Sequence, residues 1–523
     1  MSDMSAMDAR SIKALSCADA WPHPVHGVEL IETHISWVFL TGEYAYKIKK
    51  PVDFGFLDFS SLDKRRRCCE EEVRLNRRLA PDLYLDVVPI TGSAAEPRVA
   101  GPGDAIDYAV KMRQFDTDAE FDRLLARGEL GPEHVDQVAS TLARFHQGCD
   151  VAAPDSGFGT ADAVSWPVRE NFDQVRPHLR NQLGDDAWLQ FIDLEQWSLE
   201  ACERLGDSFE RRLRKGFVRE CHGDLHLRNI VVVNGEVTPF DCIEFNPKLR
   251  WIDVISELAF LLMDLDDHGR SDLSGRLVNA YLEFTGDYEG LELLRFYQVY
   301  RAMVRVKVEC LRLAQVDNAD SRLMAEMQRY LDLAGRYTSV HRPGLLITHG
   351  LSGSGKTYLS QKLLEAAPVI RVRSDVERKR IYGLSPLESS RDKLEEGIYT
   401  RIANDRTYAR LESVSSQLIG DGFDVIVDAA FLLREERDQF RRLAQVLGAP
   451  FAIVHCEMEP EIQRERVASR SERADDASEA GLLVLERQAR FEEPLGGEER
   501  AYTVVVDTTD ALDLRPLLDV LGG

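Results

Sequence analysis

The feature that most constrains the fold is a glycine-rich segment, Gly350-Leu-Ser-Gly-Ser-Gly-Lys-Thr357, which matches the phosphate-loop pattern G-x-x-x-x-G-K-[ST] at every fixed position. The apolar residues 344–349 before it predict a short buried strand, and the apolar spacing over 358–365 predicts a helix. A strand, a glycine-rich turn and a helix in this order are the setting in which the pattern binds phosphate. We therefore expect an α/β nucleotide-binding domain in the last third of the chain.

The residues of this loop have separate expected roles. Glycines allow the backbone to curl so that successive N–H groups face a polyphosphate, and the helix N-terminus adds partial positive charge. Lys356 is expected to reach the β- and γ-phosphates of ATP or GTP, and the Thr357 hydroxyl is expected to bind Mg²⁺. The predicted nucleotide-binding residues are Gly350, Ser352, Gly353, Ser354, Gly355, Lys356 and Thr357.

Length, composition and charge narrow the class of protein. A chain of 523 residues with 44% apolar content predicts several domains, each with its own core. The net charge of −24 disfavours nucleic acid and anionic membranes as partners, because both are negatively charged. The N-terminus lacks the pattern of a signal peptide and no apolar run approaches the length of a membrane span, so we expect a cytoplasmic protein. The nine scattered cysteines predict reduced thiols.

Pattern changes along the chain predict its domain organisation. Alternating apolar residues over 37–49 predict a β-hairpin, whereas the pattern from about residue 133 to 330 is mostly helical, with a β-like unit at 218–245. After residue 343, strand patterns alternate with helices, which predicts a parallel sheet covered on both faces. The predicted strands there are 344–349, 369–373, 424–428, 451–455 and 502–506. The predicted segments are a flexible tail over 1–20, a β-rich part over 21–115, a helical part over 116–335, a linker over 336–343 and the nucleotide-binding domain over 344–523.

A second group of polar residues with catalytic spacing lies between His222 and Asp241. His222, Asp224 and Asn229 are spaced H-x-D-x-x-x-x-N, as in the catalytic loop of protein-kinase-like enzymes, with Gly223 where that loop has arginine. Asp224 fits the carboxylate that accepts the proton of a substrate hydroxyl. Asn229 and Asp241 fit the amide and carboxylate that hold Mg²⁺.

Two further residues of this segment have expected roles. Glu244 is a candidate for an additional metal ligand, and His222 is expected to hydrogen-bond the loop.

Residues 25–330 resemble the aminoglycoside phosphotransferase family, a small-molecule branch of the protein-kinase-like fold. The resemblance is carried by His222-Gly-Asp224, Asn229 and Asp241, with support from the helix motif Leu142-Ala-Arg-Phe-His146. It implies an α+β bilobal domain whose N-lobe is 21–115 and whose helical C-lobe is 116–335. It also implies a hinge at 112–115 that binds adenine.

The same resemblance implies a lysine that pairs with the α- and β-phosphates. The resemblance assigns this role to Lys47, with Glu72 as its partner. Lys49 and Glu71 remain alternatives. The chain departs from the kinase pattern at residues 31–36, which contain no glycine and cannot wrap phosphates as a glycine-rich loop does.

Residues 344–520 resemble the P-loop kinase group that includes gluconate kinases, polynucleotide 5′-kinases and zeta-type toxins, and that is often described as AAA. Beyond the phosphate loop, the resemblance is carried by the segments 372–378, 424–429 and 464–473. It implies that Asp375 is a general base or orients the acceptor, and that Asp428 binds metal or water. It also implies Arg371 and Arg378 as substrate binders, and Arg466 and Arg470 as lid residues that stabilise the transferring phosphoryl group.

The whole arrangement resembles bacterial two-domain proteins that fuse an aminoglycoside-phosphotransferase-like domain to a P-loop kinase domain. It implies an ATP- and Mg²⁺-dependent phosphotransferase with two nucleotide sites, which acts on hydroxyls of sugar-like or aminoglycoside-like small metabolites. One alternative is a sensory ATPase whose N-terminal domain binds a ligand without chemistry. The other is a nucleic-acid end kinase, which the net charge disfavours.

Overall fold

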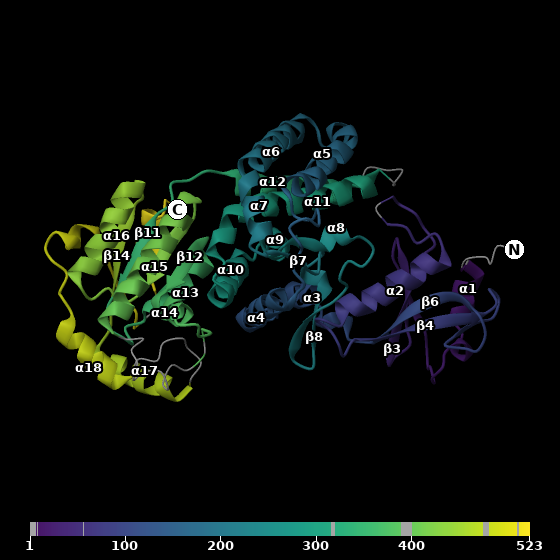
Figure 1. The fold of residues 1–523 in the computed structure, drawn as a ribbon, viewed down its shortest axis with the longest axis horizontal. Coiled ribbons are helices and arrows are strands. Elements are labelled where there is room, and N and C mark those ends of the chain that lie inside the picture. Colours follow the sequence, from purple (N-terminus) through teal and green to yellow (C-terminus); the bar gives the residue numbers. More distant parts are fainter. Residues whose placement is uncertain are drawn as a thin grey trace. The chain divides into compact units, whose positions relative to one another are not determined.

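The computed structural model describes residues 7, 9–55, 57–314, 320–386, 388, 400–473, 481–509 and 512–522. The chain contains two compact units. The first comprises Met1–Gln137, Arg144–Arg169 and Ala201–Asp264, and the second comprises Val138–Ala143, Glu170–Glu200 and Leu265–Gly523. Figure 1 shows the ribbon of the chain with many of its helices and strands labelled.

The first unit contains a six-stranded antiparallel sheet in the order β1-β2-β3-β6-β4-β5. The predicted hairpin is present as β2 and β3, where Val38 pairs with Lys47. Helix α2 (Leu62–Asn76) follows β3 and packs on β4 and β6 (Figure 1). The strands are β1 (Glu29–Glu32), β2 (Ser36–Leu40), β3 (Tyr44–Lys49), β4 (Tyr84–Gly92), β5 (Pro97–Val99) and β6 (Ala105–Arg113).

The described part of the N-terminal segment corrects the expectation of a flexible tail over 1–20. It forms α1 (Ala9–Leu15) and a short 3₁₀ turn, η1 (Ala18–Ala20). Leu15 is buried in the core of the six-stranded sheet, and the Trp21 indole N–H donates to its carbonyl at 3.0 Å. The segment has too few apolar residues to show a helical periodicity in the sequence. Its contacts with the sheet hold it in place, and the local sequence pattern does not predict such contacts.

Helix α2 is only partly exposed, although its many charges predict an exposed helix. Cys69, Glu72 and Val73 share a buried face with Arg65, in agreement with helical periodicity. Arg65 donates to Asp107 at 2.9 Å, so this buried charge is paired. The charged residues of α2 suggest full exposure to solvent, but the helix is partly buried because some of these charges form ion pairs inside the protein.

The elements that follow β6 place the segment 221–229 between two small antiparallel strand pairs. Strand β7 pairs with β10 and β8 pairs with β9, both antiparallel, and the segment 221–229 connects β7 to β8. These elements are η2 (Thr117–Ala119), α3 (Phe121–Ala126), α4 (Pro132–Gly148), α5 (Ala161–Leu183), α6 (Asp185–Arg204), α7 (Gly206–Arg214), β7 (Val218–Glu220), η3 (Leu227–Asn229), β8 (Ile230–Val233), β9 (Glu236–Pro239), α8 (Pro247–Arg250), β10 (Trp251–Asp253) and α9 (Val254–Asp267).

The second unit contains a five-stranded parallel sheet in the order β12-β13-β11-β14-β15. All five strands lie where the sequence predicts them, and Leu346, Ile426 and Val454 form part of the core beneath the helices. The strands are β11 (Leu345–His349), β12 (Val369–Arg373), β13 (Asp424–Asp428), β14 (Phe451–Glu457) and β15 (Thr503–Asp507). The predicted P-loop architecture is therefore confirmed.

The helices of the second unit come from both sides of the predicted linker. Helix α10 lies beside β12 and α13 (Figure 1). Helix α12 extends to Thr338, so the predicted linker over 336–343 includes its last three residues, and the domain boundary there stays a prediction. The remaining elements are α10 (Ser271–Thr285), η4 (Tyr288–Leu293), α11 (Leu294–Leu313), α12 (Ser321–Thr338), α13 (Lys356–Ala366), α14 (Ser374–Ile381), α15 (Arg401–Gly420), α16 (Arg434–Leu447), α17 (Pro460–Arg473), α18 (Leu482–Phe491), η6 (Glu499–Tyr502) and α19 (Arg515–Val520).

Across the described ranges, no helix combines the length and apolar character needed to cross a bilayer.

Candidate active sites

The catalytic loop of the first unit is held by its own histidine. His222 is fully buried, its Nε2 lies 2.7 Å from the Phe240 carbonyl, and the Asp224 N–H donates to its Nδ1 at 3.3 Å. Burial lowers the pKa of His222, so the ring is neutral and can accept at Nδ1 while it donates at Nε2. His222 thus hydrogen-bonds the loop in the way that the sequence analysis expects.

Gly223 explains why the loop lacks the arginine of protein kinases. Its φ is +92°, and a Cβ at this position would lie 2.8 Å from the Leu249 carbonyl oxygen. Its N–H donates to Glu257 at 2.7 Å, and Glu257 in turn lies 3.0 Å from His146 Nε2. The helix motif that ends at His146 therefore braces the loop through a buried carboxylate.

Cys221 lies beside this brace, so that His146, Cys221 and Glu257 bring possible metal-ligand atoms within 4.8 Å of one another. Both Glu257 oxygens already accept hydrogen bonds, and the Cys221 thiol donates to the Ile252 carbonyl at 3.6 Å. These hydrogen bonds explain why the three side chains lie together, and we interpret the cluster as a structural support of the loop.

Asp224 is the solvent-accessible carboxylate of the loop, with 42% of its side chain exposed. The Asn229 amide donates to the Asp224 carbonyl at 2.9 Å, so its own amide oxygen is the atom left for a metal ion. His226 Nε2 lies 3.4 Å from the Asp224 carboxylate and its ring packs against Phe260. The sequence analysis missed His226, and the available signal was its position two residues after Asp224.

Asp241 has a backbone conformation that is rare for a non-glycine residue. Its φ is +64°, its N–H donates to the Tyr84 hydroxyl at 3.1 Å, and its side chain is 41% exposed. Such conformations cost about 1–3 kcal/mol and concentrate at functional sites. The Asp241 carboxylate accepts from the Lys47 ammonium at 2.5 Å.

Two lysines of β3 share one carboxylate of α2. Lys47 lies 2.9 Å from Glu72 and also pairs with Asp241, whereas Lys49 lies 2.7 Å from Glu72 and also pairs with Glu244. Burial would lower the pKa of Lys47, but the carboxylates of Asp241 and Glu72 raise it, so the ammonium stays charged. Lys49 is 1% exposed and Glu244 is buried, which makes them a structural pair rather than phosphate and metal ligands. These contacts favour Lys47 with Glu72 over the Lys49 alternative.

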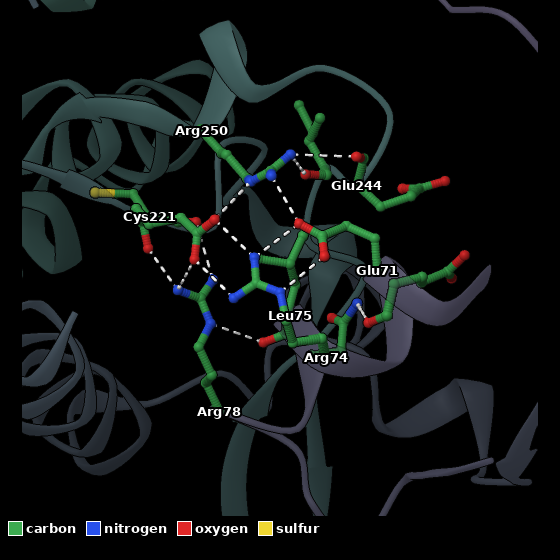
Figure 2. A network of polar contacts seen from close by, with 11 residues as sticks. Glu71, Arg74, Leu75, Arg78, Cys221, Glu244 and Arg250 are labelled. Atoms are coloured by element: carbon green, nitrogen blue, oxygen red, sulfur yellow. Dashed lines mark hydrogen bonds and ion pairs between the residues drawn. The ribbon is translucent and has the colours of Figure 1, made fainter. Parts of the chain in front are cut away.

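Glu71 belongs to a separate arginine cluster that joins α2 to the catalytic loop (Figure 2). Arg74 and Arg250 both donate to Glu71 at 2.7 Å, and both also contact the buried Glu220 carboxylate. Arg78 donates to the Glu220 carbonyl at 2.7 Å. Burial would raise the pKa of Glu220, but Arg74 and Arg250 hold it below its ordinary value. Glu71 therefore belongs to this arginine cluster, whereas Glu72 is the carboxylate of α2 that contacts Lys47.

The phosphate loop of the second unit connects β11 to α13 with glycines at two crowded positions. Gly353 and Gly355 have φ of +83° and +86°, and a Cβ on either would lie within 2.7 Å of Val467 or Thr508. Lys356 begins α13, and its ammonium donates to the Gly350 and Leu351 carbonyls at 2.8 and 2.7 Å. The loop therefore has the curled backbone that cradles an anion at a helix N-terminus.

Two glutamines of the neighbouring helices contact the loop backbone. Gln463 of α17 donates to the Ser352 carbonyl at 2.8 Å, and Gln488 of α18 accepts from the Ser352 N–H at 2.8 Å. The buried Ser354 hydroxyl has no hydrogen-bond partner among the described residues. The sequence analysis missed both glutamines, because nothing local indicates their contact with a loop more than 100 residues away.

The buried His349 and the partly exposed His455 form a pair next to the phosphate loop. They lie opposite each other on β11 and β14, with 2.8 Å between their Nδ1 atoms. Burial, together with the neighbouring His455, Arg437 and Lys356, lowers the pKa of His349 to about 3. His349 is therefore uncharged at neutral pH, and the sequence analysis did not identify it.

The predicted acids of the second unit lie at the carboxyl ends of adjacent strands. Asp428 ends β13 opposite Arg373 of β12, and Asp375 lies two residues further along in α14. The Asp428 carboxylate lies 3.4 Å from the Ser360 hydroxyl and 3.8 Å from Arg373 Nε. The sequence analysis missed Arg373, although its place at the strand end was a usable signal.

The arginines that the resemblance implies as substrate binders have partners within the protein. Arg371 is 5% exposed and pairs with Glu283 of α10 at 2.7 Å, which corrects its expected role. Arg378 donates to Asn404 at 3.1 Å. In helix α17, Arg466 donates to the Thr508 carbonyl at 3.5 Å, whereas the side chain of Arg470 lies outside the described residues.

Both centres have ligand atoms that suit Mg²⁺ and a nucleotide. Thr357 and Asp428 in the second unit, and Asn229 and Asp241 in the first, offer hydroxyl, carboxylate and amide oxygens, which are the hard ligands that Mg²⁺ prefers. The side chain of any larger residue in place of Gly353 would fill the space beside the phosphate loop. The residues present therefore fit Mg·ATP at each centre.

Comparisons with known proteins find one relative of nearly the whole chain and one of about a third of it. An uncharacterized protein of Mycobacterium tuberculosis is 29% identical over 477 residues, which cover 90% of this chain and 92% of that protein. A UPF0200 protein of Saccharolobus islandicus is 32% identical over 168 residues, which cover 32% of this chain and 84% of that protein.

Two solved structures are similar to a part of this chain. An amicoumacin kinase in complex with AMP-PNP, Ca²⁺ and Ami is 13% identical and covers 64% of this chain and 95% of its own, with a TM-score of 0.39. A gluconokinase from Sinorhizobium meliloti is 22% identical and covers 35% of this chain and 91% of its own, with a TM-score of 0.24.

Two family models match separate parts of the chain, and each part contains one of the two candidate active sites. Residues 70–297 match the phosphotransferase enzyme family and contain Asp224, Asn229 and Asp241. Residues 345–495 match the AAA domain and contain the phosphate loop. The chain thus joins a domain of the phosphotransferase enzyme family to a P-loop kinase domain of the AAA type.

Proposed function

We propose that this protein is an ATP- and Mg²⁺-dependent phosphotransferase with two nucleotide sites, which phosphorylates hydroxyls of small, sugar-like or aminoglycoside-like metabolites. The observation that carries the proposal is the meeting of Lys47, Asp224, Asn229 and Asp241 in the first unit. Lys47 pairs with Asp241, Asn229 with Asp224, and Asp224 remains accessible to an acceptor.

In the first unit, Asp224 would orient the acceptor hydroxyl and take its proton. His226 lies close enough to fix the rotamer of the Asp224 carboxylate. Lys47 would bind the α- and β-phosphates, and Glu72 keeps its ammonium charged and in place. Asn229 and Asp241 would hold Mg²⁺, which when bound neutralises charge on the phosphate oxygens.

In the second unit, the loop N–H groups and Lys356 would bind the phosphates of a second ATP. Thr357 and Asp428 would hold Mg²⁺, and Asp375 would orient the second acceptor. Arg466 approaches Thr508, which packs on Gly355, and this place suits an arginine that stabilises the transferring phosphoryl group.

The experiment that tests two sites is a count of bound nucleotide. Titration of the full-length chain with Mg·AMP-PNP in a calorimeter is expected to give two molecules bound per chain. Lys356→Ala and Asp241→Asn are each expected to leave one. The matched control is Lys362→Ala, because Lys362 lies on the same helix as Lys356 but pairs with Glu365 at the surface.

One bound molecule in the unmodified chain would contradict the two-site proposal. The variants then show which site remains.

A sensory first domain is the second candidate, favoured by the connection between β1 and β2. Residues Thr33–Ile35 contain no glycine, and Thr33 is instead tied to Ser36 through its hydroxyl. A phosphate clamp of the glycine-rich kind is therefore not formed there. If the domain only senses a ligand, Asp224→Asn leaves every activity of the protein unchanged, whereas phosphoryl transfer requires this carboxylate.

A further inference from the structure

Helix α10 packs closely on the P-loop helix, although it precedes the predicted linker. A Cβ on Gly275, in the middle of α10, would lie 2.3 Å from the Leu364 carbonyl oxygen of α13. Glycine inside a helix is less favourable than alanine by roughly 0.5–1 kcal/mol, so its presence is explained by this close approach. Arg276, the next residue, pairs with Glu365 at 2.8 Å.

One turn further along α10, Asn279 binds the edge strand of the P-loop sheet. Its amide nitrogen donates to the Val369 carbonyl at 3.0 Å, and its amide oxygen accepts from the Arg371 N–H at 2.7 Å. Strand β12 is at the edge of the sheet, so these bonds satisfy backbone groups that no other strand pairs. These two hydrogen bonds fix the position of helix α10 along β12.

Glu283, one turn after Asn279, reaches two arginines of the same strand. Its carboxylate lies 2.7 Å from Arg371 Nη2 and 3.3 Å from Arg373 Nη1. Residues i and i+2 of a strand point to the same face, which brings both guanidinium groups to one carboxylate. Burial would raise the pKa of Glu283, but these two arginines lower it, so the carboxylate is ionised.

Arg373 lies between Glu283 and the carboxylate proposed to bind metal. Arg373 Nε is 3.8 Å from Asp428 Oδ2, which is longer than its 3.3 Å contact with Glu283. We propose that Glu283 is a positioning residue of the P-loop centre, which holds Arg373 so that the Asp428 carboxylate stays available to Mg²⁺. This inference rests on the proposed function of the second unit.

The physical reason is competition between two cations for one carboxylate. Without the negative charge of Glu283, the Arg373 guanidinium is attracted to Asp428 instead, and the carboxylate is less able to bind Mg²⁺. The half-saturating Mg²⁺ concentration for nucleotide binding should therefore rise. Because Glu283 lies in the part of the chain that precedes the linker, this part contributes directly to the P-loop centre.

The test measures binding of a fluorescent ATP analogue, mant-ATP, to the full-length chain as Mg²⁺ is varied. All chains carry Asp241→Asn, which removes metal binding at the other centre. Glu283→Gln should raise the half-saturating Mg²⁺ concentration by about threefold to tenfold, the size of one charged contact. Glu283→Gln with Arg373→Gln should return it to within about twofold of the starting value.

Glu365→Gln is the matched control, because it breaks the other ion pair between α10 and the P-loop domain without touching Arg373 or Asp428. Its half-saturating Mg²⁺ concentration should not change. If Glu283→Gln behaves like this control, or if its effect persists in the double variant, the inference is wrong.

Failure of the proposed function gives a different result. If Lys356→Ala does not reduce Mg²⁺-dependent binding in the Asp241→Asn chain, the second unit is not the nucleotide site assumed here. If Glu283→Gln does not fold, Arg373→Gln alone decides the question. It should keep the half-saturating Mg²⁺ concentration at or below the starting value because it removes the competing cation, and a rise would contradict the inference.

Discussion

Glu72→Gln is expected to destabilise the first unit through two buried lysines. The carboxylate is fully buried and lies 2.9 Å from Lys47 and 2.7 Å from Lys49. Breaking a buried ion pair typically costs about 3–5 kcal/mol, because the remaining charge stays buried. Each lysine keeps a second carboxylate, from Asp241 or Glu244, so we expect a loss of about 2–3 kcal/mol in the free energy of unfolding.

The matched control is Glu70→Gln, the same substitution on the same helix. Glu70 is half exposed and pairs with Arg66 one turn away, so its loss should cost no more than about 0.5 kcal/mol. Urea unfolding followed by tryptophan fluorescence reports mainly on the first unit, because four of the six tryptophans lie in it, namely Trp21, Trp37, Trp166 and Trp251. A difference of less than about 1 kcal/mol between the variants would refute the assignment of Glu72 as the shared partner.

The effect of Glu72 should also depend on pH. Burial would raise the pKa of Glu72, but Lys47 and Lys49 lower it below its ordinary value of 4.5. A carboxyl with a lowered folded-state pKa stabilises the protein above its unfolded-state value, and this contribution disappears as pH falls through the folded-state pKa. The gap between the unmodified chain and Glu72→Gln should therefore be largest near pH 7 and should narrow below about pH 4.5.

Three further predictions concern the two centres and their boundary. Lys356→Ala should weaken Mg·ATP binding at the P-loop by roughly tenfold or more in calorimetry, because one charge-assisted phosphate contact is lost; unchanged affinity in a folded chain would contradict the assignment. Gly223→Ala should destabilise the first unit by about 1–3 kcal/mol and reduce phosphoryl transfer, because its Cβ would meet the Leu249 carbonyl at a φ of +92°; a variant with unchanged stability and activity would contradict the close approach. A fragment of residues 265–523 should melt at a higher temperature than one of residues 336–523, because only the longer one retains the Asn279 bonds to β12; equal melting would show that α10 does not stabilise the P-loop sheet.

Sequence patterns predict the parts of this protein that depend on local chemistry. The five strands of the P-loop sheet follow from short apolar runs between helical segments, and the phosphate loop follows from its glycines and Lys356. In the first unit, the spacing of Asp224, Asn229 and Asp241 suffices because one loop and one hairpin bring them together.

Contacts between distant segments account for what the sequence analysis missed. The residue type and strand position of Arg371 are those expected of a substrate-binding arginine. Its partner Glu283 lies 88 positions away in the sequence, and only the packing of α10 brings the two side chains together. The choice between Lys47 and Lys49 also depends on tertiary contacts. Both share one face of β3, and they differ in which carboxylate of the Asp241–Glu244 segment they reach.

Phosphoryl transfer to a hydroxyl tests the central claim most directly. A library of hydroxylated metabolites would be incubated with Mg·ATP and full-length protein, and each product with one added phosphoryl group would be identified by mass spectrometry. Asp224→Asn and Asp375→Asn separate the two centres, and Asp118→Asn, an exposed acid elsewhere in the first unit, is the control. We predict that at least one product forms with the unmodified chain and is lost by about 10²–10⁴ in rate with Asp224→Asn, while nucleotide binding is retained. Equal rates with and without the Asp224 carboxylate would contradict catalysis by the first unit.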